Sequence, residues 1–284
     1  MMNTVFRSTA LVLLASSWIS SGLAQTITVR GSDTLIGLSQ KWAAVYKARH
    51  PEITLQVTGG GAPAAFGALA EKKADIVLIS RSMRYKEAAA CEAALGKRPA
   101  ECKVAVIGLA VFVNTNNPVR VLTYDELFDL YRGKYKSWKA LGGPELGVTV
   151  YAQETNSICG ELFGEEVLNG KGMSADVRIQ AGPDLLKAIV GDSGAIGYGA
   201  LTQSDSVRQL SIKRAYSSTP VDPSEETIAN RIYPISRFVY CYVDPAAEKG
   251  GTKAYLDWIR SDEGQQIAKA AGFYPLPPKW RPSQ

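Results

Sequence analysis

The sequence predicts an α/β fold made of two lobes, and three observations support this prediction. Strands, turns and helices alternate through residues 26–83. A second alternation of short strands and helices runs from Leu122 to about Asn230. A last strand and helix, Phe238–Val243 and Thr252–Ala271, then return to the first group of elements. Such alternation is typical of sheets covered by helices.

The first lobe begins with a strand in which Ile27 and Val29 alternate with polar residues. The turn Gly31–Thr34 ends this strand, and Leu35–Ala48 has the apolar periodicity of a helix. The pattern then recurs. Its further elements are the strand Ile53–Val57, glycines 59–61, the helix Pro63–Lys72 and the strand Ile76–Ile79.

Three predicted strands of this lobe are followed by groups that can donate hydrogen bonds to an anion. These groups are hydroxyls, backbone N–H groups of glycines and a guanidinium. Backbone N–H groups and the positive end of a helix dipole at such turns attract negative charge. The residues that we expect here are Ser32, Asp33, Thr34, Gly60, Gly61 and Arg81. Two alternatives stay open: an ordinary helix N-cap at Ser32 or Asp33, and a surface ion pair at Arg81.

The rest of the chain divides at two expected hinge segments, Asn114–Val119 and Arg231–Ser236. The second lobe between them has expected strands and helices, which are Val148–Tyr151, Val177–Gln180, Ala195–Tyr198, Tyr124–Tyr131, Gly160–Leu168 and Pro183–Ile189. We therefore assign residues 25–112 and 237–284 to lobe 1 and residues 113–236 to lobe 2. A ligand cleft between the lobes, closed by hinge motion, is expected.

The first 24 residues have the features of a secretory signal peptide. Arg7 precedes the apolar run Ala10–Trp18, and Gly22-Leu23-Ala24 gives a cleavage site of small residues. The run is too short to span a membrane. We therefore expect export to the periplasm, cleavage near Ala24 and a mature chain that begins at Gln25.

Charge and motifs argue against two other classes of function. The net charge of +5 is mild, and lysines and arginines are scattered rather than gathered on one face as nucleic-acid binding would require. The chain has no H-E-x-x-H, G-x-S-x-G or P-loop motif, and its one histidine, His50, follows a helix end. We expect no nucleic-acid partner, no enzyme activity, no cofactor and no metal site.

Four cysteines in an exported chain raise the question of disulfides. Cys91 and Cys102 flank a short polar stretch, and we predict a disulfide between them. Cys159 and Cys241 lie far apart in sequence, so two buried thiols and a second bridge remain equal alternatives.

Several motifs in order resemble the periplasmic phosphate-binding proteins of ABC importers, the PstS-like solute-binding family. They are Gly31–Thr34, Lys47–Pro51, Val57–Gly61, Ala74–Met83, Gly108–Val119, Leu122–Trp138, Gly194–Tyr198, Ser261–Gly264 and Gly272–Leu276. The resemblance covers nearly all of the mature chain. It implies a two-lobed, type II-like periplasmic binding protein with a two-segment hinge.

The resemblance also implies a function and further site residues. The protein would capture phosphate or a related oxyanion and deliver it to the membrane subunits of an ABC importer, as a monomer. Asp75 matches an aspartate that accepts the proton of bound phosphate in such proteins, a device that selects against sulfate. A structural role, in which Asp75 pairs with Arg81 or caps a turn, is the equal alternative. The second-lobe ligand loop corresponds to Gln153, Asn156 and Ser157.

The same comparison shows departures from the family pattern. Ala62 and Ile107 replace a serine and an aspartate that many relatives have, and Gln153 replaces an arginine. Ile158 and Cys159 replace a Gly-Thr pair. The alternative function is therefore the same fold with altered or lost ligand specificity, acting as a sensor or a partner-binding protein.

Overall fold

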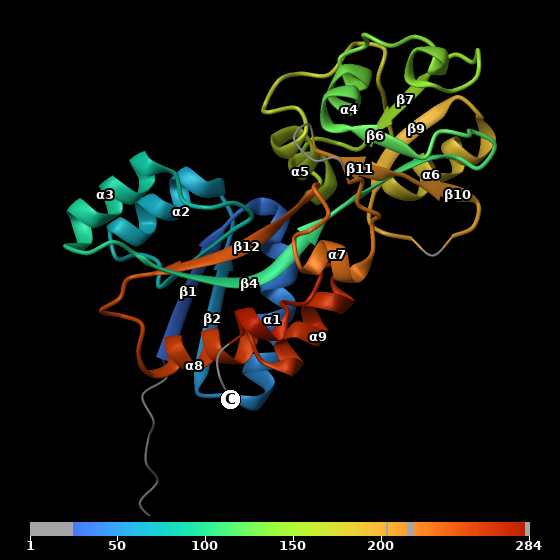
Figure 1. Cartoon of the computed structure of the whole chain (residues 1–284). Helices are drawn as coiled ribbons and strands as arrows, with labels where there is room; N and C mark the ends of the chain where they lie inside the picture. Colours follow the sequence, from blue (N-terminus) through green and yellow to red (C-terminus); the bar gives the residue numbers. More distant parts are fainter. Residues whose placement is uncertain (1–24, 203, 215–218, 282–284) are drawn as a thin grey trace, which may run out of the picture.

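The computed structural model describes residues 25–202, 204–214 and 219–281, so the expected signal peptide lies outside the described residues. Two sheets form the centres of two lobes (Figure 1). The first sheet has the strand order β2-β1-β3-β12-β4. Its strands are β1 (Gln25–Gly31), β2 (Ile53–Thr58), β3 (Ile76–Ile79), β4 (Ala100–Gly108) and β12 (Ser236–Val243). The two-lobed α/β fold predicted from the sequence is confirmed.

The directions of the strands decide which strand ends lie together at one edge of the first sheet. Strands β1, β2 and β3 are parallel, whereas β12 runs antiparallel between β3 and β4. The amino end of β12 therefore lies at the same edge as the carboxyl ends of β1 and β3. This edge faces the second lobe (Figure 1).

Helices cover both faces of the first sheet. Helices α1 (Ile36–Arg49), α8 (Gly250–Ile259) and α9 (Asp262–Ala270) cover one face. Helices α2 (Gly61–Ala70) and α3 (Tyr85–Leu95) cover the other, where the ring of Phe66 meets that of Tyr242 edge to face. Each face thus has its own apolar core.

The second lobe contains a five-stranded sheet of order β10-β5-β9-β7-β8 and a two-stranded sheet of β11 and β6. Its strands are β5 (Ala110–Asn114), β6 (Val121–Thr123), β7 (Thr149–Ala152), β8 (Arg178–Ile179), β9 (Ala195–Gly199), β10 (Val207–Gln209) and β11 (Ser211–Lys213). Its helices are α4 (Tyr124–Tyr131), α5 (Ile158–Glu166) and α6 (Gly182–Gly191), and α7 (Glu225–Ala229) follows on the way back to the first lobe. Across both lobes, the described residues also form the short 3-10 helices η1 (Asp33–Leu35), η2 (Trp138–Leu141) and η3 (Pro278–Trp280).

Helix α5 is anchored in the second lobe by aromatic packing. Phe163 stacks on Tyr198 of β9 with ring centroids 4.0 Å apart, and it also contacts Tyr131 of α4 at 4.4 Å. Leu162 and Phe163 are both buried. The helix is therefore part of the second lobe, and its opposite face contacts the first lobe.

The chain crosses from the first sheet to the second at Leu109, between β4 and β5. Residues 110–112, which the sequence analysis placed in lobe 1, form part of β5 in the second sheet. The return segment leads into β12 at Ser236. The division into lobes at residues 112 and 237 otherwise stays a prediction.

Two element predictions for the first lobe need correction. The expected single helix Thr252–Ala271 is two helices: α8 ends at Ile259, and the Ser261 hydroxyl caps α9 by accepting a hydrogen bond from the Gly264 N–H. Helix α3 was not expected, because its alanine-rich sequence lacks a clear apolar stripe.

The predicted disulfide between Cys91 and Cys102 is wrong for this structure, where all four cysteines are free thiols. Cys91 lies on α3 and its thiol contacts the carbonyl oxygen of Phe66 on α2, 3.5 Å away. Cys102 lies on β4, directly opposite Cys241 of β12. The neighbour of Cys102 is therefore Cys241, on a strand distant in sequence, and not Cys91, which sequence spacing had predicted.

None of the helices in the described ranges has the length and apolar composition that a bilayer span requires.

Candidate functional site

A cavity of about 320 Å³ lies where the first sheet meets α5. Both lobes line it, through Ser32, Gly61, Ala62, Pro63, Ile79, Ser80, Arg81, Arg84, Glu161 and Glu165. A larger cavity of about 490 Å³ lies elsewhere, around Thr115, Arg208 and Pro223. It contains none of the predicted site residues, so the smaller, inter-lobe cavity is the better candidate.

The turn after β1 presents two hydroxyls to this region. A Cβ atom at Gly31 would lie 1.9 Å from the carbonyl oxygen of Leu78, so only glycine lets β1 run this close to β3. The Ser32 N–H then donates to the same carbonyl at 3.0 Å. The hydroxyls of Ser32 and Thr34 lie 2.9 Å apart. The fixed backbone thus positions both side chains.

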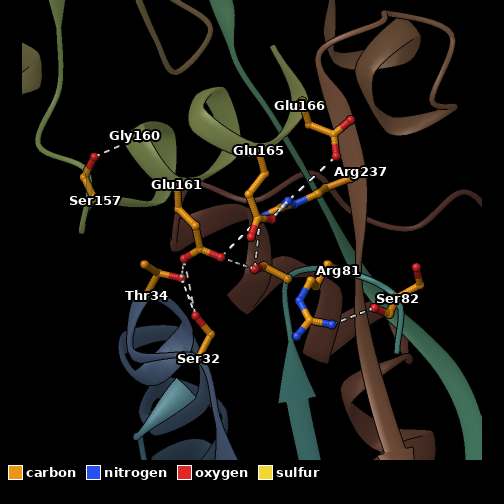
Figure 2. A network of polar contacts seen from close by, with 11 residues as sticks. Ser32, Thr34, Arg81, Ser82, Ser157, Gly160, Glu161, Glu165, Glu166 and Arg237 are labelled. Atoms are coloured by element: carbon orange, nitrogen blue, oxygen red, sulfur yellow. Dashed lines mark hydrogen bonds and ion pairs between the residues drawn. The ribbon is translucent and has the colours of Figure 1, made fainter. Parts of the chain in front are cut away.

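The carboxylate of Glu161, on α5 of the second lobe, receives hydrogen bonds from this turn (Figure 2). The Thr34 hydroxyl donates to Oε2 at 2.8 Å, and the Ser32 hydroxyl donates to the same oxygen at 3.4 Å. The buried Ser80 hydroxyl, at the end of β3, donates to Oε1. Three strand-end hydroxyls of the first lobe therefore converge on one oxyanion from the second.

Arg237, at the amino end of β12, completes the cluster. Its side chain is only 5 % exposed. Nη2 donates to Ser80 at 3.1 Å and to Glu161 Oε1 at 3.2 Å. Nη1 binds Glu165 and lies 3.7 Å from Glu166, whereas the buried Nε has no hydrogen-bond partner among the described residues. A buried guanidinium is suited to binding an oxyanion because it presents several fixed donors.

The structure places four of the predicted first-lobe residues in other roles. Asp33 accepts a hydrogen bond from the Gly60 N–H at 2.9 Å, so these two residues tie the first turn to the second. Arg81 borders the cavity but forms a two-point ion pair with Glu87, at 2.9 and 2.7 Å. Asp75 accepts from the Thr28 N–H at the opposite end of β3, away from the cluster.

The predicted second-lobe residues also have structural partners. Gln153 is buried and donates to the carbonyl oxygen of Tyr198 at 3.1 Å. The Ser157 hydroxyl accepts from the Gly160 N–H at 3.0 Å and donates to the carbonyl oxygen of Glu154, which makes it the N-cap of α5 (Figure 2). Asn156 is exposed on the loop before this helix.

Ser80, Glu161 and Arg237 are the site residues that the prediction missed. A charged residue inside the apolar segment Ser236–Val243 is one signal for Arg237, because charges are rarely buried without a partner. Ser80 follows the strand Ile76–Ile79 just as Ser32 follows the first strand. Glu161 carries no comparable signal, because acidic residues are common in the first turn of any helix.

Metal ligation finds no support in residues 25–202, 204–214 and 219–281, which contain no group of three or more His, Cys, Asp or Glu side chains placed to hold an ion. His50 instead stacks on Tyr46, with ring centroids 4.3 Å apart.

Comparisons with known proteins agree with this architecture. Residues 18–263 match the family model described as a PBP superfamily domain. The phosphate-binding protein PstS of Pseudomonas aeruginosa is 30% identical over 277 residues, which cover 92% of this chain and 86% of that protein. Protein SphX of Synechococcus elongatus is 28% identical, with 89% of this chain and 78% of that protein covered.

Solved structures show the same fold. A possible phosphate binding protein from Planctomyces limnophilus superimposes with a TM-score of 0.79 at 26% identity, covering 90% of this chain and 95% of that one. An ABC-type phosphate transport receptor from Vibrio cholerae superimposes with a TM-score of 0.71 at 24% identity, covering 89% and 100%. The chain belongs to the PBP superfamily and, within it, to the family of PstS-like phosphate-binding proteins.

Proposed function

We propose that this protein is an exported solute-binding protein that captures phosphate or a related oxyanion between its lobes for an ABC importer. One observation carries the proposal. The side chains of Ser32, Thr34, Ser80 and Arg237 all donate hydrogen bonds to one carboxylate, that of Glu161, at the edge of the first sheet. The names of the Pseudomonas and Planctomyces relatives support phosphate as the ligand. The protein acts as a binding protein rather than an enzyme, and as a monomer.

Three of the side chains that donate to the Glu161 carboxylate are neutral hydroxyls, and the fourth is the buried cation Arg237. The hydroxyls lie at strand ends whose positions the backbone fixes, so little conformational entropy is lost when an anion binds. Gly61, at the first turn of α2, lines the same cavity and brings the positive end of a helix dipole to it.

The first test is a titration of the mature chain, from Gln25, with phosphate, arsenate, sulfate and molybdate, read by thermal shift and calorimetry. A ligand at one hundred times its dissociation constant should stabilise the fold by about 2.7 kcal/mol. Thr34→Val should weaken binding by roughly ten- to one-hundredfold, the equivalent of a charge-assisted hydrogen bond of about 1.5–3 kcal/mol.

Thr26→Val is the matched control, because Thr26 is exposed at the opposite end of β1. It should leave the affinity unchanged. If none of the four oxyanions binds, or if both threonine variants bind as well as the parent, capture of an oxyanion at this site is rejected.

A second candidate function is supported by the acidic side chains of α5. Glu161, Glu165 and Glu166 all lie within 4 Å of Arg237, so carboxylates already more than balance its single positive charge. This arrangement suits a family member whose ligand specificity is altered or lost and which acts as a sensor or a partner-binding protein. Failure to bind all four oxyanions, with the fold intact, is the outcome that favours this candidate.

A further inference from the structure

The carboxylate of Glu161 occupies the point at which the donors of the first lobe converge (Figure 2). One of its oxygens accepts from Ser32 and Thr34, and the other accepts from Ser80 and Arg237. A carboxylate and a phosphate group present the same kind of acceptor to such donors. We propose that Glu161 is an internal oxyanion, which fills the anion subsite of the ligand-free protein and must leave before an external oxyanion binds. This inference rests on the proposed function.

The position of Glu161 on its helix suits a displaceable group. It lies in the first turn of α5, after the N-cap Ser157, and Leu162 and Phe163 beside it are buried in the second lobe. Glu165, four residues further on, lies on the same face of the helix and contacts Arg237. The contacts of Glu161 with Ser32, Thr34, Ser80 and Arg237 involve side chains alone. A hinge motion that withdraws α5 would break them without breaking any strand pairing.

The space next to Glu161 offers an external anion a place to enter. The inter-lobe cavity of about 320 Å³ is bounded by Ser32, Gly61, Ser80 and Arg84 as well as by Glu161 itself. A water molecule in the liquid takes about 30 Å³, so the cavity has room for a small hydrated ion. An oxyanion that enters this cavity would meet the hydroxyls of Ser32 and Ser80 while the negative charge of Glu161 repels it, so either the oxyanion or the Glu161 carboxylate must leave.

An internal competitor lowers the apparent affinity for every external oxyanion by the same factor. The protein binds ligand only in the fraction of molecules in which Glu161 has left the subsite, and the apparent dissociation constant rises as this fraction falls. Removing the charge of Glu161 should therefore tighten binding. The opposite is expected if Glu161 instead accepts a proton from bound hydrogen phosphate, because its removal would then weaken phosphate binding and favour sulfate.

The experiment compares the parent with Glu161→Gln and Glu161→Ala by calorimetry with phosphate and with sulfate. We expect both variants to bind phosphate at least tenfold more tightly, with sulfate affinity rising by a similar factor. Glu154→Gln, an exposed acidic residue on the loop before α5, is the matched control and should bind as the parent does. Circular dichroism and thermal unfolding verify that each variant is folded.

A second readout follows the lobes themselves. Without ligand, both Glu161 variants should have a larger radius of gyration in X-ray scattering than the parent, because the bonds from the first lobe to this carboxylate are lost. Addition of phosphate should restore the compact form. Unchanged scattering in the ligand-free variants would overturn the idea that Glu161 holds the lobes together.

The outcomes separate this inference from the proposed function. If the parent binds phosphate and both Glu161 variants bind it equally or more weakly, the internal oxyanion is rejected and the receptor assignment stands. If the parent binds nothing while the variants bind phosphate, the internal oxyanion is supported and capture of phosphate by the parent is rejected. If neither parent nor variants bind, both proposals fail.

Discussion

Arg81 and Glu87 form a largely buried ion pair beside the cleft, with side chains 16 % and 15 % exposed. Burial acts to raise the pKa of Glu87, but hydrogen bonds from the Arg81 side chain and from the Arg84 N–H outweigh it and lower the pKa below its ordinary value. The pair therefore fixes the loop after β3, and it holds the Arg81 guanidinium away from the hydroxyl cluster.

Glu87→Gln should lower the free energy of unfolding at neutral pH by about 1–2 kcal/mol, because a partly buried guanidinium loses its charged partner. The lowered pKa means that this stabilisation is complete above the unfolded-state value of about 4.3 and is lost as the pH falls through the folded-state value. Urea unfolding between pH 7 and pH 3 should show the difference from the parent shrinking towards acid.

Glu92→Gln, at an exposed position on the same helix, should show no such pH dependence relative to the parent. A Glu87→Gln deficit that stayed constant down to pH 3 would contradict this account of the pair.

The residues of the cluster differ in how far the sequence reveals them. Ser32 and Thr34 follow a clear strand and a glycine that the close approach to Leu78 requires, so their position could be predicted. Arg237 could not be placed, because nothing in its local sequence shows that β12 inserts between β3 and β4. Asp75 precedes β3, whereas the hydroxyl cluster lies at the other end of that strand, so its ligand role stays a prediction without a contact in this cluster.

At the scale of elements, α5 depends on Ser157 for its first turn. The hydroxyl both accepts from Gly160 and donates to Glu154, so its hydrogen-bonding capacity is used within the helix start. The resemblance to the family predicts that Ser157 binds the ligand, but a serine at a helix start can equally cap the helix. The observed bonds favour the capping role.

Ser157→Ala should therefore destabilise the fold by about 1 kcal/mol, the usual effect of losing an N-cap. Its phosphate affinity should stay within a few-fold of the parent, because the site donors come from the first lobe. Chemical unfolding and calorimetry on one preparation would provide both values. A variant with unchanged stability and strongly reduced phosphate affinity would show that Ser157 binds the ligand.

Regular elements with strong apolar patterns could be predicted closely. The strand Ile76–Ile79 and the helix Tyr124–Tyr131 have the expected bounds. Helix α3 was missed because its alanines offer little periodicity, and the pairing of cysteines was then inferred from sequence spacing alone. Which strands become neighbours depends on long-range packing, and that placed Cys241 beside Cys102.

Cys102 and Cys241 should form the disulfide of the oxidised protein. They lie opposite each other on adjacent strands, and a hydrogen bond from the Cys241 thiol lowers the pKa of Cys102, which favours the reactive thiolate. A disulfide oxidant would be reduced to two thiols, taking up the two electrons and the two protons that Cys102 and Cys241 lose as their S–S bond forms. Non-reducing peptide mapping should show this linked pair, with Cys91 still free.

Reduction should then lower the midpoint of thermal unfolding, because the bond would close a long loop. The Cys102→Ser and Cys91→Ser variants provide the comparison, and only the first should abolish the effect of reductant. Free thiols at Cys102 and Cys241 after oxidation, or a linked Cys91, would refute the pairing.

At the scale of the whole molecule, the two lobes meet through charged and polar side chains at the edge of the first sheet. Four side chains of the first lobe contact the acidic face of α5, while α5 itself is packed into the second lobe by Phe163. We expect this division to let α5 move away from the first sheet together with the second lobe. We therefore predict that ligand capture and lobe closure are coupled.

The most direct test of the central claim is a crystal structure of the mature protein with arsenate, using the anomalous scattering of arsenic to locate the ligand. We expect arsenic between the hydroxyls of Ser32, Thr34 and Ser80 and the guanidinium of Arg237, with the Glu161 carboxylate displaced. Arsenic bound at another place, or a Glu161 carboxylate still bonded to these four residues in crystals soaked to saturation, would contradict it.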